Sequence, residues 1–199
     1  MSWDDDGYYD ASHGVHKCRR YHGKLRDFYQ AAYNYTVAAN AFGASGVFIS
    51  LLGDQTRIAV VLSAFVAFAS LMESIFRYEH KARLHHDLGA RFTRLAAEIE
   101  MLPETPSNLA KVRAARLEIE AEEPAEKRLV ELMASNDEQR SRGVSEDQLV
   151  KLSFWQRNLG YLLTFGMQRL ERERAARQRL NGAEVAQEAA VDQTKEGSA

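Results

Sequence analysis

The sequence contains a single cysteine, Cys18, so the chain cannot form an internal disulfide and cannot build a zinc site from cysteines alone. It also lacks an excess of charge of either sign, because 26 Lys and Arg residues stand against 28 Asp and Glu residues. Nucleic-acid-binding domains are usually strongly basic. We therefore expect no nucleic-acid partner, and we interpret Cys18 as an ordinary free thiol rather than a lipidated or reactive one.

Motifs of catalysis and cofactor binding are missing as well. The sequence has no P-loop, no Gly-x-Ser-x-Gly element and no environment for a catalytic cysteine. The six histidines fall in two groups, His13, His16 and His22 in one and His80, His85 and His86 in the other. Neither group contains the i, i+4 pair that sets two imidazoles on one helix face. We interpret the histidines as polar or interfacial residues, and we expect no metal, no other cofactor and no enzymatic activity.

What the sequence does contain is two long apolar runs. Residues 28–53 carry no charge and, at about 1.5 Å per residue, would extend roughly 39 Å as a helix, more than the roughly 30 Å hydrocarbon core of a bilayer. The second run spans a bilayer only if it extends over residues 58–76, which include Glu73. Four polar residues, 54–57, separate the two runs. The pattern predicts a transmembrane helical hairpin.

Small and polar residues interrupt both arms at helical spacing. Such residues let helices approach closely and form hydrogen bonds in lipid, so we expect self-association of the hairpin. Glu73 has two interpretations: it marks the interface as a partner of Arg77, or it belongs to a polar ring at a pore mouth. The candidate positions for helix packing or pore lining are Thr36, Asn40, Gly43, Ser63, Ala67, Ser70 and Glu73.

Basic residues flank the hairpin on both sides, whereas the turn holds one Arg balanced by one Asp. This asymmetry predicts that both termini lie in the cytoplasm. The first 27 residues begin acidic and lack an apolar core, so we expect no cleavable signal and expect the first arm to direct insertion. The flanking basic residues are Lys17, Arg19, Arg20, Lys24, Arg26, Arg77, Lys81 and Arg83.

The rest of the chain has the apolar spacing of amphipathic helices and no strand alternation. The stripe from Leu84 to Leu102 predicts that the second arm continues as a cytoplasmic helix, which ends at Pro103. Ser107 or Asn108 is expected to cap a further helix that Pro124 interrupts and that resumes to about Asn136. Ser145 and Gln148 predict a capping box for a last helix, which runs to about Leu170.

The predicted fold class is therefore all-α, a two-helix transmembrane hairpin that continues into a cytoplasmic α-helical bundle. The expected divisions are a polar, basic segment over residues 1–27, the hairpin over 28–76 and a cytoplasmic helical region over 77–180. The composition of residues 181–199, which lack aromatic side chains, predicts a disordered tail.

The order of several short motifs around the hairpin resembles that of the SLATT family, two-transmembrane effector domains associated with SMODS nucleotidyltransferases and SLOG sensor domains. The resemblance covers residues 17–163. It rests on His22 and Arg26 before the hairpin, on Ala82-Arg83-Leu84-His85 to Phe92 and Leu95-Ala-Ala-Glu98-Ile99-Glu100 after it, and on Arg116-Leu-Glu118-Ile-Glu120, Glu122-Glu123-Pro124 and Asn136 ahead of Arg140. The residues that carry family motifs are therefore His22, Arg26, His85, Glu118, Glu120, Glu123, Pro124 and Asn136.

The resemblance implies a membrane effector of bacterial or phage conflict systems, one that oligomerises and breaches the inner membrane. In contrast to the family pattern, we expect no attached nucleotidyltransferase or SLOG-like domain. We therefore expect the trigger to come from a nucleotide-signal enzyme or sensor in trans, from a diffusible ligand or from the cytoplasmic helices. Two alternatives stay open: a non-conducting, membrane-anchored helical scaffold, and a soluble bundle in which both apolar runs are core helices.

The membrane orientation can be tested directly. A reporter fused after Ala199 is expected to be active only when it is of the type that works in the cytoplasm, because basic residues flank both ends of the hairpin. Paired fusions to a cytoplasmic and a periplasmic reporter measure this, and activity of the periplasmic reporter alone would contradict the orientation.

Overall fold

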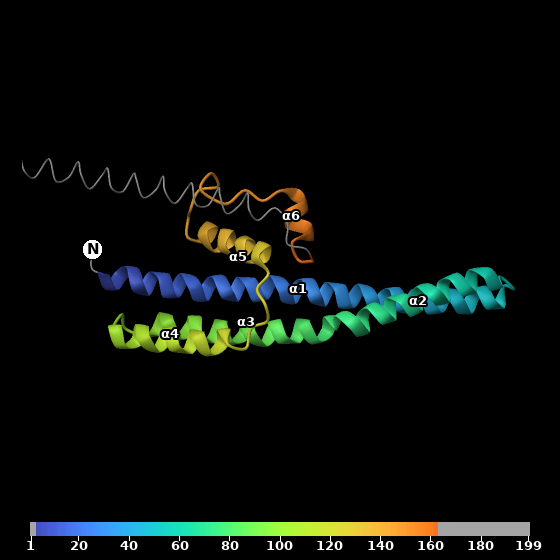
Figure 1. Cartoon of the computed structure of the whole chain (residues 1–199), viewed down its shortest axis with the longest axis horizontal. Helices are drawn as coiled ribbons and strands as arrows, with labels where there is room; N and C mark the ends of the chain where they lie inside the picture. The colour runs from blue at the N-terminus through green and yellow to red at the C-terminus, as the bar shows by residue number, and fades with distance from the viewer. Residues whose placement is uncertain (1–2, 163–199) are drawn as a thin grey trace, which may run out of the picture. The chain divides into compact units, whose positions relative to one another are not determined.

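The computed structural model describes residues 3–162, and all regular elements within this range are helices (Figure 1), which confirms the all-α class. The chain divides into two compact units, Met1–Glu126 and Lys127–Ala199. The predicted tail at 181–199 lies outside the described residues. The prediction of a last helix that continues to about Leu170 is wrong, because the helix ends at Leu159 and a turn follows over 160–162. The helices are α1 (Trp3–Leu52), α2 (Thr56–Phe76), α3 (Tyr78–Met101), α4 (Pro106–Glu120), α5 (Arg128–Ser141) and α6 (Phe154–Leu159).

The first helix, α1, runs for 50 residues without interruption, from Trp3 to Leu52. The composition changes from polar to apolar near residue 27, but the helix continues through this point without a break. One face of α1 is shielded along its whole length by residues spaced alternately three and four apart, the spacing of a coiled-coil seam. The residues of this seam are Tyr8, Ala11, Val15, Cys18, His22, Leu25, Tyr29, Ala32, Thr36, Ala39, Gly43, Gly46 and Ser50.

The two apolar helices, α1 and α2, form the expected hairpin. Asp54 adopts a left-handed conformation (φ 56°) in the turn after α1, and α2 begins at Thr56. A Cβ atom at Gly43 would overlap the Val66 side chain, and one at Gly46 would lie 2.9 Å from Leu62. The two helices therefore approach closely where the seam of α1 carries glycine.

The prediction that the second arm continues without a break into the next helix is wrong by one residue. Arg77 is left-handed (φ 51°, ψ 52°) and separates α2 from α3, although its N–H still donates to Glu73 O at 2.8 Å. The break brings the rings of Phe76 and Tyr78 into a stack with centroids 5.6 Å apart. Residues two apart do not face each other on a regular helix, so this stack requires the interruption.

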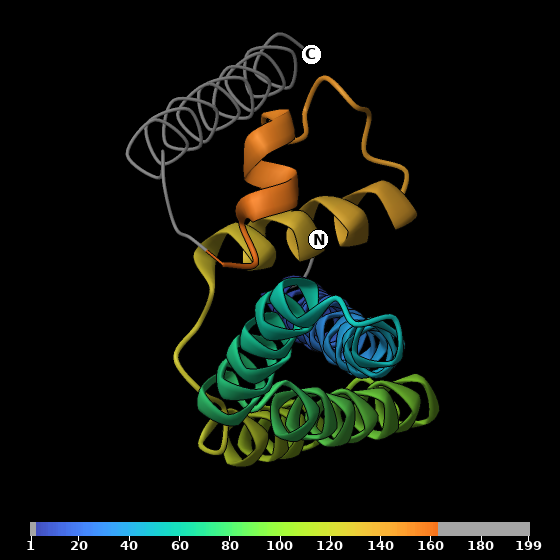
Figure 2. The same cartoon turned by 90° about the vertical axis from the view of Figure 1, so that its right-hand side faces the viewer.

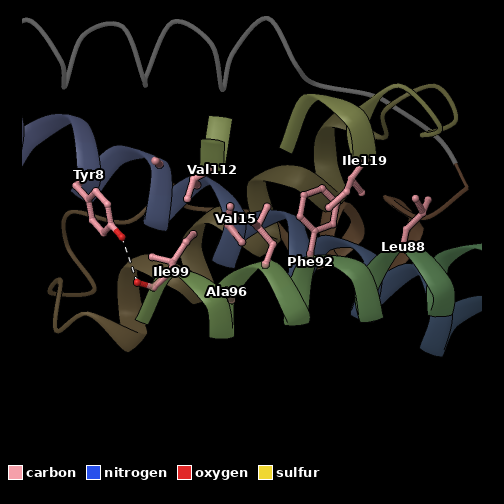
Figure 3. Packing of buried hydrophobic residues seen from close by; sticks show 10 residues of the cluster. Tyr8, Val15, Leu88, Phe92, Ala96, Ile99, Val112 and Ile119 are labelled. Atoms are coloured by element: carbon pink, nitrogen blue, oxygen red, sulfur yellow. Dashed lines mark hydrogen bonds between the residues drawn. The ribbon is translucent and has the colours of Figure 1, made fainter. Parts of the chain in front are cut away.

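The core of the first unit lies between α1, α3 and α4. Viewed along α1 (Figure 2), α3 and α4 lie together on one side of it, joined by the short proline-containing link after Met101. Phe92 and Val15 are fully buried, and the hydroxyl of Tyr8 donates to Ile99 O at 3.2 Å (Figure 3). The buried residues of this core are Tyr8, Ala11, Val15, Leu88, Phe92, Leu95, Ala96, Ile99, Val112 and Ile119.

Prolines set the ends of these helices as predicted, but the cap of α4 differs. The helix α3 ends at Met101, ahead of Pro103, and α4 ends at Glu120, ahead of Pro124. The N-cap of α4 is Thr105, whose side chain accepts from Asn108 N at 3.2 Å, rather than Ser107 or Asn108. Pro106 occupies the first helical position, where its missing N–H is not needed, so the cap falls one residue earlier.

The second unit contains α5 and α6, and here the predicted capping box at Ser145 and Gln148 is wrong. The amide of Asn136 donates to Val150 O at 2.7 Å and accepts from Val150 N at 3.1 Å, which ties up the backbone of that segment as a neighbouring strand would. The helix α6 begins after Ser153 instead, with a capping box formed by Ser153 and Gln156.

The core of the first unit predicts a strong response to truncation of Phe92. Phe92→Ala is expected to lower the free energy of unfolding by about 3 to 5 kcal/mol, because it removes a fully buried ring and leaves a cavity. Thermal unfolding of the detergent-solubilised protein, followed by circular dichroism, measures the loss. Leu117→Ala is the control, since Leu117 is 65% exposed on α4; equal effects of both substitutions would contradict the described core.

Candidate functional site

The outer surface of the hairpin is apolar and exposed. The two helices are long and apolar enough to cross a membrane, and only 6% of each apolar window is buried within the chain. Phe42 is 79% exposed and Val61 is 68% exposed. A core helix of a soluble protein would be mostly buried, whereas both runs are mostly exposed among the described residues.

The polar and small residues predicted for the hairpin fall on two different faces. Thr36, Asn40 and Gly43 belong to the seam side of α1 that meets α2, and Glu73 lies two turns beyond Val66 on the face of α2 that meets α1. Ser63, Ala67 and Ser70 are exposed and lie beside that contact rather than within it. The predicted residues therefore do not form a single stripe within one chain.

Two of the residues on the inner face carry oxygens that lack partners. Asn40 Oδ1 and Glu73 Oε2 are buried, and neither has a hydrogen-bond partner among the described residues. Ser63, on the outer face, instead donates to Ala59 O of its own helix at 2.8 Å. A buried oxygen without a partner is costly in an apolar environment.

Three of the residues that carry family motifs meet inside the first unit, although they are far apart in the sequence. His22 Nδ1 lies 2.9 Å from His85 Nδ1, and His22 Nε2 lies 3.0 Å from Glu123 Oε1. His22 is 0% exposed and His85 is 4% exposed. The interpretation of these two histidines as interfacial residues is therefore wrong: they link α1, α3 and the segment after α4.

Aromatic rings surround the histidine pair on both sides. The ring of Phe92 stacks on His22 with centroids 5.4 Å apart, and the ring of Tyr29 stacks on His85 at 5.6 Å. The two imidazoles stack on each other at 5.2 Å, and Tyr21 presents its edge to both. The pair thus occupies two layers in a column of four rings.

The acidic residues after α4 fasten that segment to the other helices. Glu122 pairs with Arg91 of α3 at 2.6 Å, and this hydrogen bond holds the pKa of Glu122 below its usual value. Glu120 pairs with Arg116 one turn earlier, also at 2.6 Å. The Glu120 pair stays within α4, whereas the Glu122 pair and the contact between Glu123 and His22 fix the chain near the point where the first unit ends.

The remaining residues that carry family motifs lie outside the histidine cluster. Arg26 pairs with its neighbour Asp27 at 2.7 Å, and Glu118 is exposed on α4, where its charge adds to the field at Arg91. Pro124 is exposed in the link after α4. Asn136 holds Val150 in the second unit.

The described residues contain no group of three or more His, Cys, Asp and Glu side chains arranged to hold a metal ion. Comparisons with protein-family models, curated proteins and solved structures found no match. The family resemblance therefore rests on the motifs in the sequence alone.

Cys18 lies in the seam of α1, close to the acidic segment. Burial raises the pKa of its thiol to about 11, with a smaller opposing effect from Arg116 and a smaller reinforcing one from Glu123. At pH 8 only about one thiol in a thousand is then ionised, whereas an ordinary cysteine is partly ionised.

This environment predicts slow alkylation of Cys18 in the folded protein. At pH 8, iodoacetamide is expected to react about a hundredfold more slowly than with the unfolded chain, because the thiolate is the reacting form. The rate is expected to rise about tenfold per pH unit up to about pH 10. Mass spectrometry of the folded and denaturant-unfolded protein measures both rates, and equal rates would contradict the raised pKa.

Proposed function

We propose that the protein is a membrane effector of a bacterial or phage conflict response, which oligomerises and permeabilises the inner membrane with both termini in the cytoplasm. The observation that carries the proposal is the apolar hairpin, whose outer surface is exposed among the described residues. Lipid or further copies of the hairpin would cover it, and the order of motifs that resembles the SLATT family supports the same role.

Self-association is supported by small residues of α2 that do not take part in the contact between α1 and α2. Ser63, Ala67 and Ser70 present small side chains on an exposed face of α2, which suits close contact with a helix of another copy. Two helices cannot enclose a channel, so permeation would require several copies. On rearrangement of the hairpin, Asn40 and Glu73 could gain the partners that their buried oxygens lack in the single chain.

The continuity of α1 supports transmission of a signal into the membrane. The same rigid helix contributes Val15 and His22 to the core of the first unit and Gly43 to the hairpin. A change in the soluble part therefore acts on the hairpin without passing through a flexible linker. The trigger would be a nucleotide-signal enzyme or sensor in trans, a diffusible ligand or the helices themselves.

A non-conducting scaffold is the second candidate, and one observation favours it. Gly43 and Gly46 are fully engaged by Val66 and Leu62 of the same chain, so the closest helix contact is satisfied without another copy. In this role the hairpin would anchor the helical core to the bilayer and recruit partners.

Leakage from lipid vesicles that contain the purified protein separates the two functions. Ser63→Leu is expected to lower the leakage rate at least tenfold while insertion stays intact, because a large side chain blocks close contact on the exposed face. Val61→Leu is the matched control and should leave leakage unchanged, since Val61 lies on an exposed apolar face of the same helix.

The wild-type protein and Glu73→Gln complete this experiment. If Glu73 lies at a pore mouth, Glu73→Gln changes ion selectivity, whereas a residue that only marks the interface leaves selectivity as it was. Wild-type vesicles that never leak, with or without cyclic nucleotides, would contradict the pore and favour the scaffold.

A further inference from the structure

The histidine pair requires a shared proton. Each neutral imidazole carries one N–H, and the 2.9 Å contact between His22 Nδ1 and His85 Nδ1 needs one N–H donor and one lone pair. The contact between His22 Nε2 and Glu123 takes a second proton, on Nε2. With both rings neutral, Nε2–H of His22 donates to Glu123 and Nδ1–H of His85 donates to His22.

The same geometry also holds one additional proton. If His22 becomes imidazolium, its Nε2–H still donates to the carboxylate of Glu123 and its Nδ1–H donates to the lone pair on His85 Nδ1. A second additional proton cannot bind without breaking the contact between the two rings. With both rings charged, two N–H groups would point at each other across 2.9 Å and two positive rings would be stacked 5.2 Å apart.

Charged and titratable groups face the pair from three elements. From the segment after α4, Glu123 supplies one carboxylate. From α1, the facing groups are the phenols of Tyr21 and Tyr29. From α3, Lys81 lies 5.5 Å from the Tyr29 ring and adds a positive charge on that side.

The neighbouring carboxylates pair with arginines. The carboxylate of Glu122 is engaged by Arg91, and that of Glu120 by Arg116. Cys18 stays a neutral thiol, because burial keeps its pKa near 11. A second positive charge on the pair therefore sets two N–H groups and two positive rings against each other unless the rings separate.

We propose that His22 and His85 form a proton-operated latch, which holds α1 against α3 while the two rings carry at most one charge and opens when both become imidazolium. The open form binds at least one more proton than the closed form. The closed form therefore loses stability as the pH falls and regains it as the pH rises.

Opening of the latch has a direct path to the base of the hairpin. The column of rings that includes the pair continues from Tyr29 to Tyr78, with centroids 6.5 Å apart, and from Tyr78 to Phe76 at 5.6 Å. These last two rings flank Arg77, the left-handed residue between α2 and α3. Separation of His85 from His22 therefore disturbs the stack that fixes this junction, whether or not the hairpin conducts.

Hydrogen exchange of the full-length protein in lipid nanodiscs tests the latch. After correction for the intrinsic pH dependence, peptides from residues 82–92 and 119–126 are expected to exchange at least tenfold faster at pH 5.5 than at pH 7.5. Peptides from α5 serve as the internal reference, because α5 belongs to the other unit and has no part in the latch.

Two variants assign the effect to the pair. His85→Phe keeps a ring in the column but cannot take up a proton, so the pH-dependent loss of protection should disappear. His86→Gln is the matched control, since His86 is the exposed neighbour on the same helix, and it should retain the loss. The same pH response in His85→Phe as in the wild type, or no response in the wild type, overturns the proposal.

A direct measurement of the protonation state of the histidine rings tests the proposal even if His85→Phe does not fold. In nitrogen-15 spectra of histidine-labelled wild-type protein, both rings are expected to become imidazolium in the pH interval in which α3 loses protection. Full protonation of both rings without loss of protection would show that the pair is no latch.

Discussion

The seam of α1 is the constraint on which the rest of the first unit depends. Because its residues recur every three or four positions from Tyr8 to Ser50, a single uninterrupted helix offers one continuous seam to its partners. The N-terminal half of that seam buries large side chains against α3 and α4. In the apolar half the seam carries the glycines Gly43 and Gly46, which allow α2 to approach closely. Core and hairpin are therefore two parts of the same interface.

The polar members of the seam show how this interface tolerates groups that a core usually excludes. His22 occupies a seam position and is fully buried, but its two ring nitrogens have partners on two other segments. Asn40 lies next to the seam residue Ala39, in the apolar half, where its Oδ1 has no partner among the described residues. The first polar residue is satisfied by tertiary contacts, and the second has no such contact among the described residues.

The sequence predicted those features that depend on local chemistry. A charge-free run longer than a bilayer predicted the hairpin, and Pro103 and Pro124 predicted where α3 and α4 end. Features that arise from tertiary contacts could not be predicted from the sequence. His22 and His85 are 63 residues apart, and nothing in their local pattern shows that their rings meet.

Local signals were also overruled by contacts from a distance. The segment at Ser145 has a good capping pattern, yet the two hydrogen bonds from Asn136 to Val150 hold the following backbone outside a helix. The motif order that resembles the SLATT family did include His22, His85 and Glu123, but as separate positions. These three side chains meet only because α1, α3 and the segment after α4 pack together.

The left-handed residue Arg77 determines the rotational phase of α3. Counting in threes and fours from Glu73 along an unbroken helix leads to Phe76, His80, Arg83 and Asp87, and all four are exposed. The buried stripe of α3 instead passes through Ala82, His85 and Leu88. One residue with positive φ thus shifts the stripe by two positions. An unbroken helix that kept the α2 contact would turn His85 away from α1 and present charged side chains to the seam.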